Sequence, residues 1–302
     1  MQAIRHIFAA TDLTAASLRV VERGFRLAQQ TGAHYTVMHA LGLDALGPLR
    51  NLLGHKASDV AQAVLAHKRA ELEAIVRDPR YHHGINARVL LEEGLATSVV
   101  PAYAATTDAD LVLVGVRGAS TLRRLLVGST ASRLLRKSQC PVLVVRHAHS
   151  KPYQRVLVPV DFSAGSLRSL QLARQLAPQA RLVLLHVFEV PFEGMLQYAG
   201  VSSAEIQRYR AEAHVRHTQQ LQQLAAQAGL ADADYTGVVL HGDAVHHILE
   251  LERDHHCDLI VMGKHGTHVT EELLLGSVTQ RVLSQTHADM LVVVDKRGPG
   301  SA

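Results

Sequence analysis

The chain has 302 residues, of which 47% are hydrophobic and 19% are charged. At roughly 150 residues per domain this length predicts two domains, and the apolar content excludes a disordered chain. The formal net charge is +4, and the chain has no tryptophan and 4% aromatic residues. We therefore expect no nucleic-acid-binding function, because such proteins need basic patches and aromatic stacking platforms.

The start of the chain and its cysteines both favour a cytoplasmic location. Residues 1–8 lead directly into a strand-like segment and lack the apolar stretch of a secretory signal. The two cysteines, Cys140 and Cys257, are too few for a disulfide framework or a four-cysteine zinc site. No apolar run approaches the roughly 18 residues of a membrane span, so no span is expected.

The predicted elements alternate between strands and helices along the whole chain. In the first half the order is strand 5–11, helix 15–31, strand 34–40, helix 56–77, strand 86–92, helix 97–106, strand 111–116, helix 128–138 and strand 141–145. In the second half it is strand 156–160, helix 165–177, strand 181–187, helix 203–228, strand 234–240, helix 244–255, strand 258–263, helix 276–286 and strand 290–294. A capping-box sequence, Ser202 to Glu205, marks the start of the long helix 203–228.

The two halves are copies of one domain. Asp12 and Asp161 end similar first strands, and residues 110–115 resemble residues 258–263, with a nearly constant offset of about 148 residues. A polar segment that ends at Pro152 suits a short linker. The predicted domains are 1–149 and 150–302.

Strands joined through helices predict right-handed crossovers. The expected fold is therefore α/β, with two tandem doubly wound domains. Each is a five-stranded parallel sheet with helices on both faces. Such sheets bind ligands beyond the carboxyl ends of their strands, where the strand order reverses.

Both copies carry the same glycine pattern after their fourth strand. Two glycines lie three positions apart, and after nine further residues a Gly-Ser pair opens the next helix. The glycines let the backbone approach a ligand, and the helix start offers free N–H groups to a phosphate. The pattern predicts a phosphate site in each copy, with plain turns as the alternative. Its members are Gly115, Gly118, Gly128 and Ser129 in the first copy and Gly263, Gly266, Gly276 and Ser277 in the second.

Together with two further features, the glycine pattern resembles the universal stress protein family. One is the first-strand signature ending in aspartate, clearest at residues 156–161, and the other is the closing strand at residues 140–145. The resemblance covers both copies, essentially residues 4–146 and 154–295. It implies a Rossmann-like domain, similar to adenine nucleotide alpha hydrolases, that binds ATP, ADP or AMP with or without Mg²⁺.

The resemblance also implies which residues line the nucleotide site. The first-strand aspartate contacts adenine, a residue at the end of the second strand lines the nucleoside pocket, and the glycines and serine hold ribose and phosphates. The residue after the serine adds backbone contacts. The implied cofactor-binding residues are Asp12, Ala40, Gly115, Gly118, Gly128, Ser129, Thr130, Pro159, Asp161, Val187, Gly263, Gly266, Gly276, Ser277 and Val278.

The two copies differ in ways that bear on this site. The family's proline before the aspartate is kept as Pro159 but is missing before Asp12. The first copy has three arginines between its glycines. The second has Lys264 and His265 there, but also two glutamates. We expect the first copy to hold phosphates better, and solvated loop charges are the alternative. The charges in question are Arg117, Arg123, Arg124, Lys264, His265, Glu271 and Glu272.

The 20 histidines raise the question of a metal site. Six potential ligands gather in the second copy, but they lack the spacing of the common zinc motifs, so exposed helix-surface histidines are expected rather than a metal centre. His39 and His186 end equivalent strands, which predicts a packing or hydrogen-bonding role near the pocket. The six are His241, His246, His247, His255, His256 and Cys257.

No P-loop, nucleophile elbow or kinase signature is present, so no enzyme is expected beyond slow ATP hydrolysis. The leading hypothesis is a nucleotide-binding sensor or signalling protein of the stress response, read by an unknown protein partner. Apolar strands 142–145 and 291–294 are candidates for pairing in a homodimer or an internal pseudo-dimer. The alternatives are a nucleotide-free interaction scaffold and a zinc-responsive protein that uses the histidines of the second copy.

Overall fold

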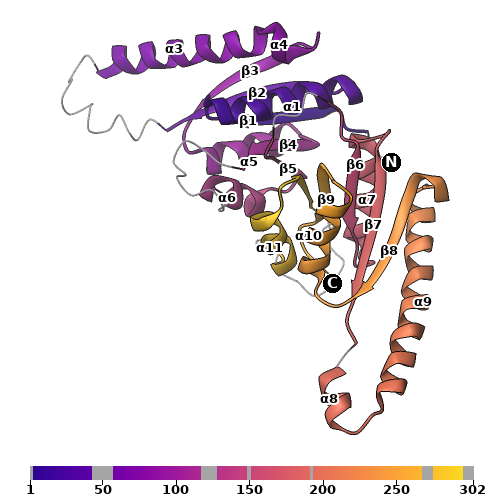
Figure 1. Ribbon diagram of the computed structural model, residues 1–302. Coiled ribbons are helices and arrows are strands. Elements are labelled where there is room, and N and C mark those ends of the chain that lie inside the picture. The colour runs from indigo at the N-terminus through magenta and orange to yellow at the C-terminus, as the bar shows by residue number, and fades with distance from the viewer. Residues whose placement is uncertain are drawn as a thin grey trace. The chain divides into compact units, whose positions relative to one another are not determined.

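The computed structural model describes residues 3–42, 57–116, 128–147, 151–190, 193–266 and 275–294 (Figure 1). These residues form two compact units, the first within Met1–Pro152 and the second within Tyr153–Asp295. Among the helices of the described ranges, none combines the length and apolarity needed to cross a bilayer.

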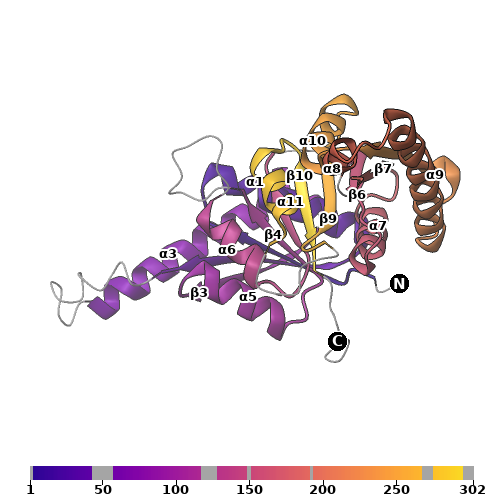
Figure 2. The ribbon, with the colours of Figure 1, turned by 90° about the horizontal axis from the view of Figure 1, so that it is seen from below.

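Unit 1 is a parallel five-stranded sheet in the order β3-β2-β1-β4-β5. Helix α1 packs on β1 and β4, while α5 and α6 lie side by side (Figures 1 and 2). The reversal of strand order falls between β1 and β4, as expected for a doubly wound sheet. The elements are β1 (His6–Thr11), α1 (Ala15–Thr31), β2 (His34–Leu41), α3 (Ala57–Arg77), α4 (Pro79–His82), β3 (Ala87–Glu93), α5 (Ala96–Thr106), β4 (Leu111–Gly115), α6 (Ser129–Lys137) and β5 (Val142–Val145).

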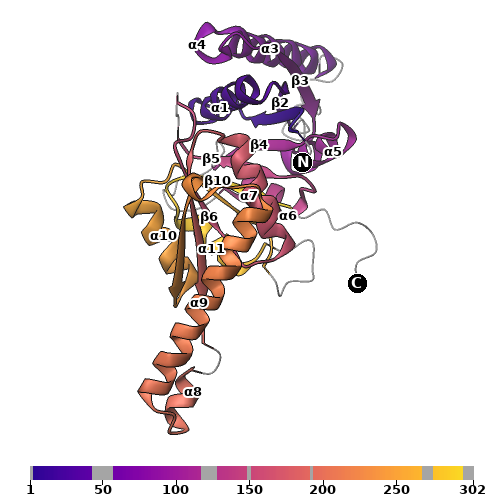
Figure 3. The same cartoon turned by 90° about the vertical axis from the view of Figure 1, so that its right-hand side faces the viewer.

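Unit 2 repeats this topology in the order β8-β7-β6-β9-β10, again parallel. Helix α9 packs on β8, and its first turns project with α8 past the strand ends (Figure 3). The α/β fold class is thereby confirmed. The elements are β6 (Arg155–Pro159), α7 (Ala164–Leu176), β7 (Arg181–Phe188), α8 (Glu193–Tyr198), α9 (Ser203–Gln227), the 3₁₀ turn η3 (Asp232–Asp234), β8 (Tyr235–His241), α10 (Ala244–Asp254), β9 (Leu259–Gly263), α11 (Ser277–Gln285) and β10 (Asp289–Val293).

Most predicted helices and strands match the observed ones to within one or two residues, because their apolar periodicity is strong. The capping box that opens α9 is confirmed: Ser202 Oγ accepts from the Glu205 N–H at 3.2 Å, and the Glu205 carboxylate accepts from the Ser202 N–H at 3.0 Å. The short helices α4 and α8 were not predicted. Segments of this length bury too little surface to leave a periodic pattern.

One carboxylate in each unit joins the first strand to the fourth. Asp110 Oδ2 accepts hydrogen bonds from the backbone N–H groups of Arg5 and His6, at 2.8 and 3.0 Å. In unit 2, Asp258 accepts from the Gln154 N–H through Oδ2 at 2.8 Å and from the Arg155 N–H through Oδ1 at 3.1 Å. These bonds satisfy donors at the start of β1 and β6 and fix which residues lie opposite each other across the strand-order reversal.

A close contact between α1 and β2 distinguishes the core of unit 1. Tyr35 is 2% exposed and donates its hydroxyl to the Val21 carbonyl at 3.0 Å, with its ring over Gly24. A Cβ added at Gly24 would lie 2.1 Å from the Tyr35 hydroxyl oxygen. The equivalent positions in unit 2 carry Ala173 and Leu182, both fully buried. The unit that has the larger residue on the strand, Tyr35, therefore has the smaller residue on the helix, Gly24.

We predict that Gly24→Ala lowers the free energy of unfolding by about 2 kcal/mol or more, because the rigid Tyr35 ring must move. Urea denaturation measures this loss. The double variant Gly24→Ala/Tyr35→Leu, which copies the pair of unit 2, should be more stable than Gly24→Ala alone. Ala16→Ser, at an exposed position of α1, serves as the control. Equal stability of the single and double variants would contradict the packing argument.

Candidate functional site

The first strand of unit 1 ends in an aspartate whose carboxylate is held by the following turn. Asp12 Oδ1 accepts from the backbone N–H of Thr14 at 3.1 Å and from its hydroxyl at 2.6 Å. Thr14 is also the N-cap of α1 and accepts from the Ser17 N–H. The start of the helix therefore fixes the orientation of the Asp12 side chain.

Asp161 is held in the same way after β6. Its Oδ1 accepts from the Ser163 N–H at 3.1 Å, the Ser163 hydroxyl at 2.6 Å and the Ser166 hydroxyl at 2.7 Å. The other carboxylate oxygen, Oδ2, lies beside Gly266, where an added Cβ would be only 3.2 Å away. The structure thus brings together the two predicted ligand positions Asp161 and Gly266.

The residue after each aspartate has an unusual backbone conformation. Leu13 has φ of 63° and Phe162 has φ of 62°, in the left-handed region that non-glycine residues rarely adopt. Such conformations cost about 1–3 kcal/mol and concentrate at functional sites. Both copies keep this strained turn at the carboxyl edge of the sheet, next to the predicted adenine contact.

Helices α6 and α11 each begin at a Gly-Ser pair, as predicted. Gly128 and Gly276 are the N-caps, and their N–H groups donate to Val116 and Lys264 carbonyls at 2.8 and 2.9 Å. The first intrahelical bonds run from Ser132 to Gly128 and from Gln280 to Gly276. The N–H groups of the three residues in between have no partner within the helix and can bind an anion. These are Ser129, Thr130 and Ala131 in unit 1, and Ser277, Val278 and Thr279 in unit 2.

The start of α11 is also tied to the loop after β9. The Thr279 hydroxyl donates to the Gly263 carbonyl at 2.9 Å, and a Cβ on Gly276 would lie 3.6 Å from His265 Cα. Lys264 in this loop is 3% exposed, so it is not the solvated charge considered from the sequence. In unit 2, Asp161, the 263–266 loop and the start of α11 therefore surround one location at the carboxyl edge.

The remaining predicted site residues lie at or near the same strand ends. Pro159 ends β6, Gly115 ends β4, and Ala40 and Val187 are half-buried residues near the ends of β2 and β7. Gly118 lies outside the described residues. So do most of the charges on which the comparison of phosphate binding between the copies depends, namely Arg117, Arg123, Arg124, Glu271 and Glu272.

His39 and His186 have the hydrogen-bonding role that their equivalent positions predict. His39 Nδ1 donates to the Thr11 carbonyl at 2.8 Å, and His186 Nδ1 donates to the Val160 carbonyl at 2.9 Å. Each histidine thus ties the second strand to the end of the first, directly before the site aspartate. The sequence did not show the partner, because a backbone carbonyl leaves no residue signature.

In unit 2, His186 also belongs to an aromatic cluster. Its ring centroid is 4.2 Å from that of Phe162 and 4.6 Å from that of His217 on α9, which in turn lies 5.1 Å from Phe188. The His186 Nε2 atom is buried without a hydrogen-bond partner among the described residues. Burial lowers the pKa of His186, and the nearby His217 acts in the same direction, although the Val160 hydrogen bond opposes the shift. On balance, these surroundings favour the neutral form of the ring.

We predict that acidification destabilises the protein partly through His186. Since its folded-state pKa is lowered, the unfolded chain takes up a proton that the folded chain refuses, and stability falls as the pH drops below about 6.5. His186→Asn cannot be protonated and keeps a donor near Val160. The loss of unfolding free energy between about pH 7.5 and 5.5 should be smaller in this variant than in the parent chain. Urea denaturation at both pH values tests this, with the exposed His214→Asn as the control, and equal losses in all three proteins would refute it.

Two open pockets are lined by other residues. One of about 360 Å³ adjoins α10 and α11 in unit 2 and is lined by Asp243, His246 and Arg281 among others. The other, of about 560 Å³, adjoins α3 and β3 in unit 1 and includes Arg69, Glu73 and Arg77. Neither contains a residue of the predicted nucleotide site, and both linings carry charges of both signs.

Comparison with known proteins agrees with this architecture. The family model of the universal stress protein family matches residues 3–146 and again 152–294. The chain therefore belongs to the universal stress protein family, with two family domains in tandem. Two universal stress proteins of Methanocaldococcus jannaschii are 25% and 26% identical, over 47% and 48% of this chain and 82% and 96% of their own lengths. One of Mycobacterium tuberculosis is 25% identical over 62% of each chain.

Solved structures show the same fold over the full length. A universal stress protein from Archaeoglobus fulgidus matches with a TM-score of 0.65 at 22% identity, covering 97% of both chains. A further protein described as a putative universal stress protein, from Pseudomonas aeruginosa, matches with a TM-score of 0.59 at 17% identity, over 97% of this chain and 94% of that one. At this level of identity the likeness concerns the fold.

Proposed function

We propose that this protein binds an adenine nucleotide, ATP, ADP or AMP, at the carboxyl edge of each sheet and acts as a sensor or signalling protein of the stress response. The observation that carries the proposal is the meeting of Asp161, Gly266 and the start of α11 at one place in unit 2. A carboxylate fixed beside a glycine is suited to accept a hydrogen bond from a donor group of adenine or ribose. The free N–H groups of a helix start suit phosphate.

The duplication supports the proposal further. The aspartate held by its own turn, the left-handed residue after it, and the Gly-Ser helix start occur at equivalent places in both units. Simple turns without a ligand would not require these three features to occur together. In the proposed complex, Asp12 and Asp161 contact the nucleoside, and Ser129 and Ser277 contact phosphate.

We propose a binding function rather than an enzymatic one. The Asp161 Oδ1 atom already accepts three hydrogen bonds, so this carboxylate is positioned as an acceptor and is poorly suited to take a proton from water. Phosphoryl transfer also needs a group that orients the attacking water. We expect ATP hydrolysis to be slow at most, with nucleotide occupancy as the signal.

The direct test is to denature freshly purified protein, identify the released nucleotide by chromatography and measure its ratio to protein. Two equivalents of adenine nucleotide are expected if both units bind, and one if the copies have divided their roles. Absence of nucleotide, together with no change of melting temperature in millimolar ATP, would replace this proposal by the interaction-scaffold hypothesis.

We predict that Asp161→Asn and Gly266→Ala each weaken nucleotide binding in unit 2 by about tenfold or more, since a charged acceptor is lost or displaced. Isothermal titration calorimetry with ATP measures this loss. Asp12→Asn should remove the site of unit 1 instead, and the exposed Asp59→Asn is the matched control. Unchanged affinity and stoichiometry in all the site variants would show that the nucleotide lies elsewhere.

A further inference from the structure

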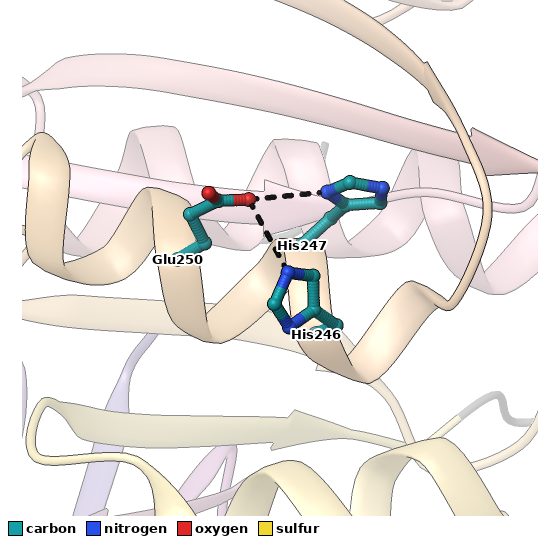
Figure 4. Close-up of side chains that lie close together, drawn as sticks. All are labelled: His246, His247 and Glu250. Carbon is teal, nitrogen blue, oxygen red and sulfur yellow. Dashed lines mark hydrogen bonds and ion pairs between the residues drawn. The ribbon is translucent and has the colours of Figure 1, made fainter.

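The first two turns of α10 bring two imidazoles and one carboxylate together (Figure 4). Glu250 Oε2 lies 3.3 Å from His247 Nδ1 and 3.8 Å from His246 Nε2, and one ligand atom from each residue lies within 4.8 Å of the others. The spacing places Glu250 three and four residues after the two histidines, on the same side of the helix. His246 is exposed, so a solute can reach the cluster from solvent.

The proton on the His247 ring is placed by its second contact. His247 Nε2 lies 3.1 Å from the His241 carbonyl oxygen, which can only accept, so Nε2 carries the hydrogen. In the neutral ring, Nδ1 then turns a lone pair toward the carboxylate of Glu250. Two acceptors at 3.3 Å need a cation between them, either a second proton or a metal ion. Histidines that bind metals typically donate their other N–H to such a carbonyl.

The spacing of two of the three atoms already fits a small divalent ion. With metal–ligand distances of about 2.0–2.1 Å, neighbouring ligands of a tetrahedral zinc site are about 3.3–3.4 Å apart. The pair His247 Nδ1 and Glu250 Oε2 already has this separation. His246 Nε2 lies 3.8 Å from Glu250 Oε2, and the three ligand atoms lie within 4.8 Å of one another. The exposed side chain of His246 must therefore rotate toward the other two ligands to complete the site.

Unit 1 shows that packing does not require these residues. Gly94 and Gly242 occupy equivalent turns, with φ of 135° and 128°. An added Cβ would meet Val99 Cγ1 at 2.9 Å in unit 1 and His247 Nε2 at 3.2 Å in unit 2. Val99 and His247 therefore occupy the same place against the backbone, and an aliphatic side chain is sufficient there. Where unit 2 has His246, His247 and Glu250, unit 1 has Ser98, Val99 and Ala102.

We propose that His246, His247 and Glu250 bind one divalent transition-metal ion of the Zn²⁺ class at the start of α10. Imidazole and carboxylate suit Zn²⁺, Co²⁺ and Ni²⁺, and three protein ligands leave a coordination position for water. None of the three residues belongs to the proposed nucleotide site, and the proposal does not rest on nucleotide binding. It also differs from the histidine cluster considered from the sequence, because it includes Glu250.

The other members of that cluster have different surroundings. His241 Nε2 pairs with Glu193 at 2.9 Å, and His255 is the C-cap of α10. Burial raises the pKa of Cys257 to about 12, which disfavours the thiolate that a metal needs. The metal site is therefore limited to the first turns of the helix.

The test is calorimetric titration of the full-length, chelator-treated protein with ZnCl₂ alone. We expect one tight equivalent of Zn²⁺, which is lost in the triple variant His246→Ser/His247→Val/Glu250→Ala. These replacements are the residues of unit 1, so the fold should be kept, as circular dichroism and melting in EDTA will show. Zn²⁺ should raise the melting temperature of the parent chain and leave that of the triple variant unchanged. His214→Ala, on an exposed face of α9, controls for the loss of a surface histidine.

Nitrogen-15 NMR provides a second readout that loss of folding cannot imitate. On addition of Zn²⁺ the His247 Nδ1 resonance should shift as a metal ligand while Nε2 stays protonated. Two results would overturn the proposal. One is equal Zn²⁺ affinity in the parent chain and the triple variant. The other is no stoichiometric Zn²⁺ uptake together with a doubly protonated His247, which would make the cluster an ion pair.

Discussion

The hydrogen bonds between the Asp110 carboxylate and the start of β1, and between Asp258 and the start of β6, hold each sheet together where its strand order reverses. The first and fourth strands are far apart in sequence, and their pairing places the aspartate after the first strand near the end of the fourth. If β1 shifted by one residue against β4, the turn that follows Asp12 would face the other side of the sheet. In unit 2 the equivalent pairing brings Asp161 and Gly266 together. The candidate site depends on this register more than on any single ligand residue.

The two copies keep this framework and differ in what it carries. Leu13 and Phe162 share a left-handed backbone, yet only the second contributes to an aromatic cluster. Val99 and His247 fill one place beside equivalent glycines, yet only the second can bind a metal. Since the backbone conformation is the same in each pair, the differences concern chemistry rather than folding. The copies are thus best understood as one scaffold with two sets of side chains.

Much of the fold could be predicted from the sequence. Strong apolar periodicity and the repeated glycines predicted the elements, the duplication and the doubly wound class, and Ser202 and Glu205 predicted the start of α9. The strained turns at Leu13 and Phe162 could not be predicted, because neither residue type signals a positive φ. The cluster of His246, His247 and Glu250 was missed in part because a glutamate on a helix surface is ordinary. The cluster becomes a candidate metal site only when the carbonyl of His241 is considered, because this carbonyl fixes the proton of the His247 ring on Nε2.

The Gly24–Tyr35 contact has a consequence for exchange of sequence between the copies. The equivalent pair in unit 2 is Ala173 and Leu182, so each unit has a matched large and small residue. A recombination event with its breakpoint between α1 and β2 would join an alanine to a tyrosine, and the ring would overlap the new methyl group. The opposite product would join a glycine to a leucine and leave a cavity. We expect both mixed products to be less stable than the present chain, so this pair would select against exchange of sequence between the two halves at this point.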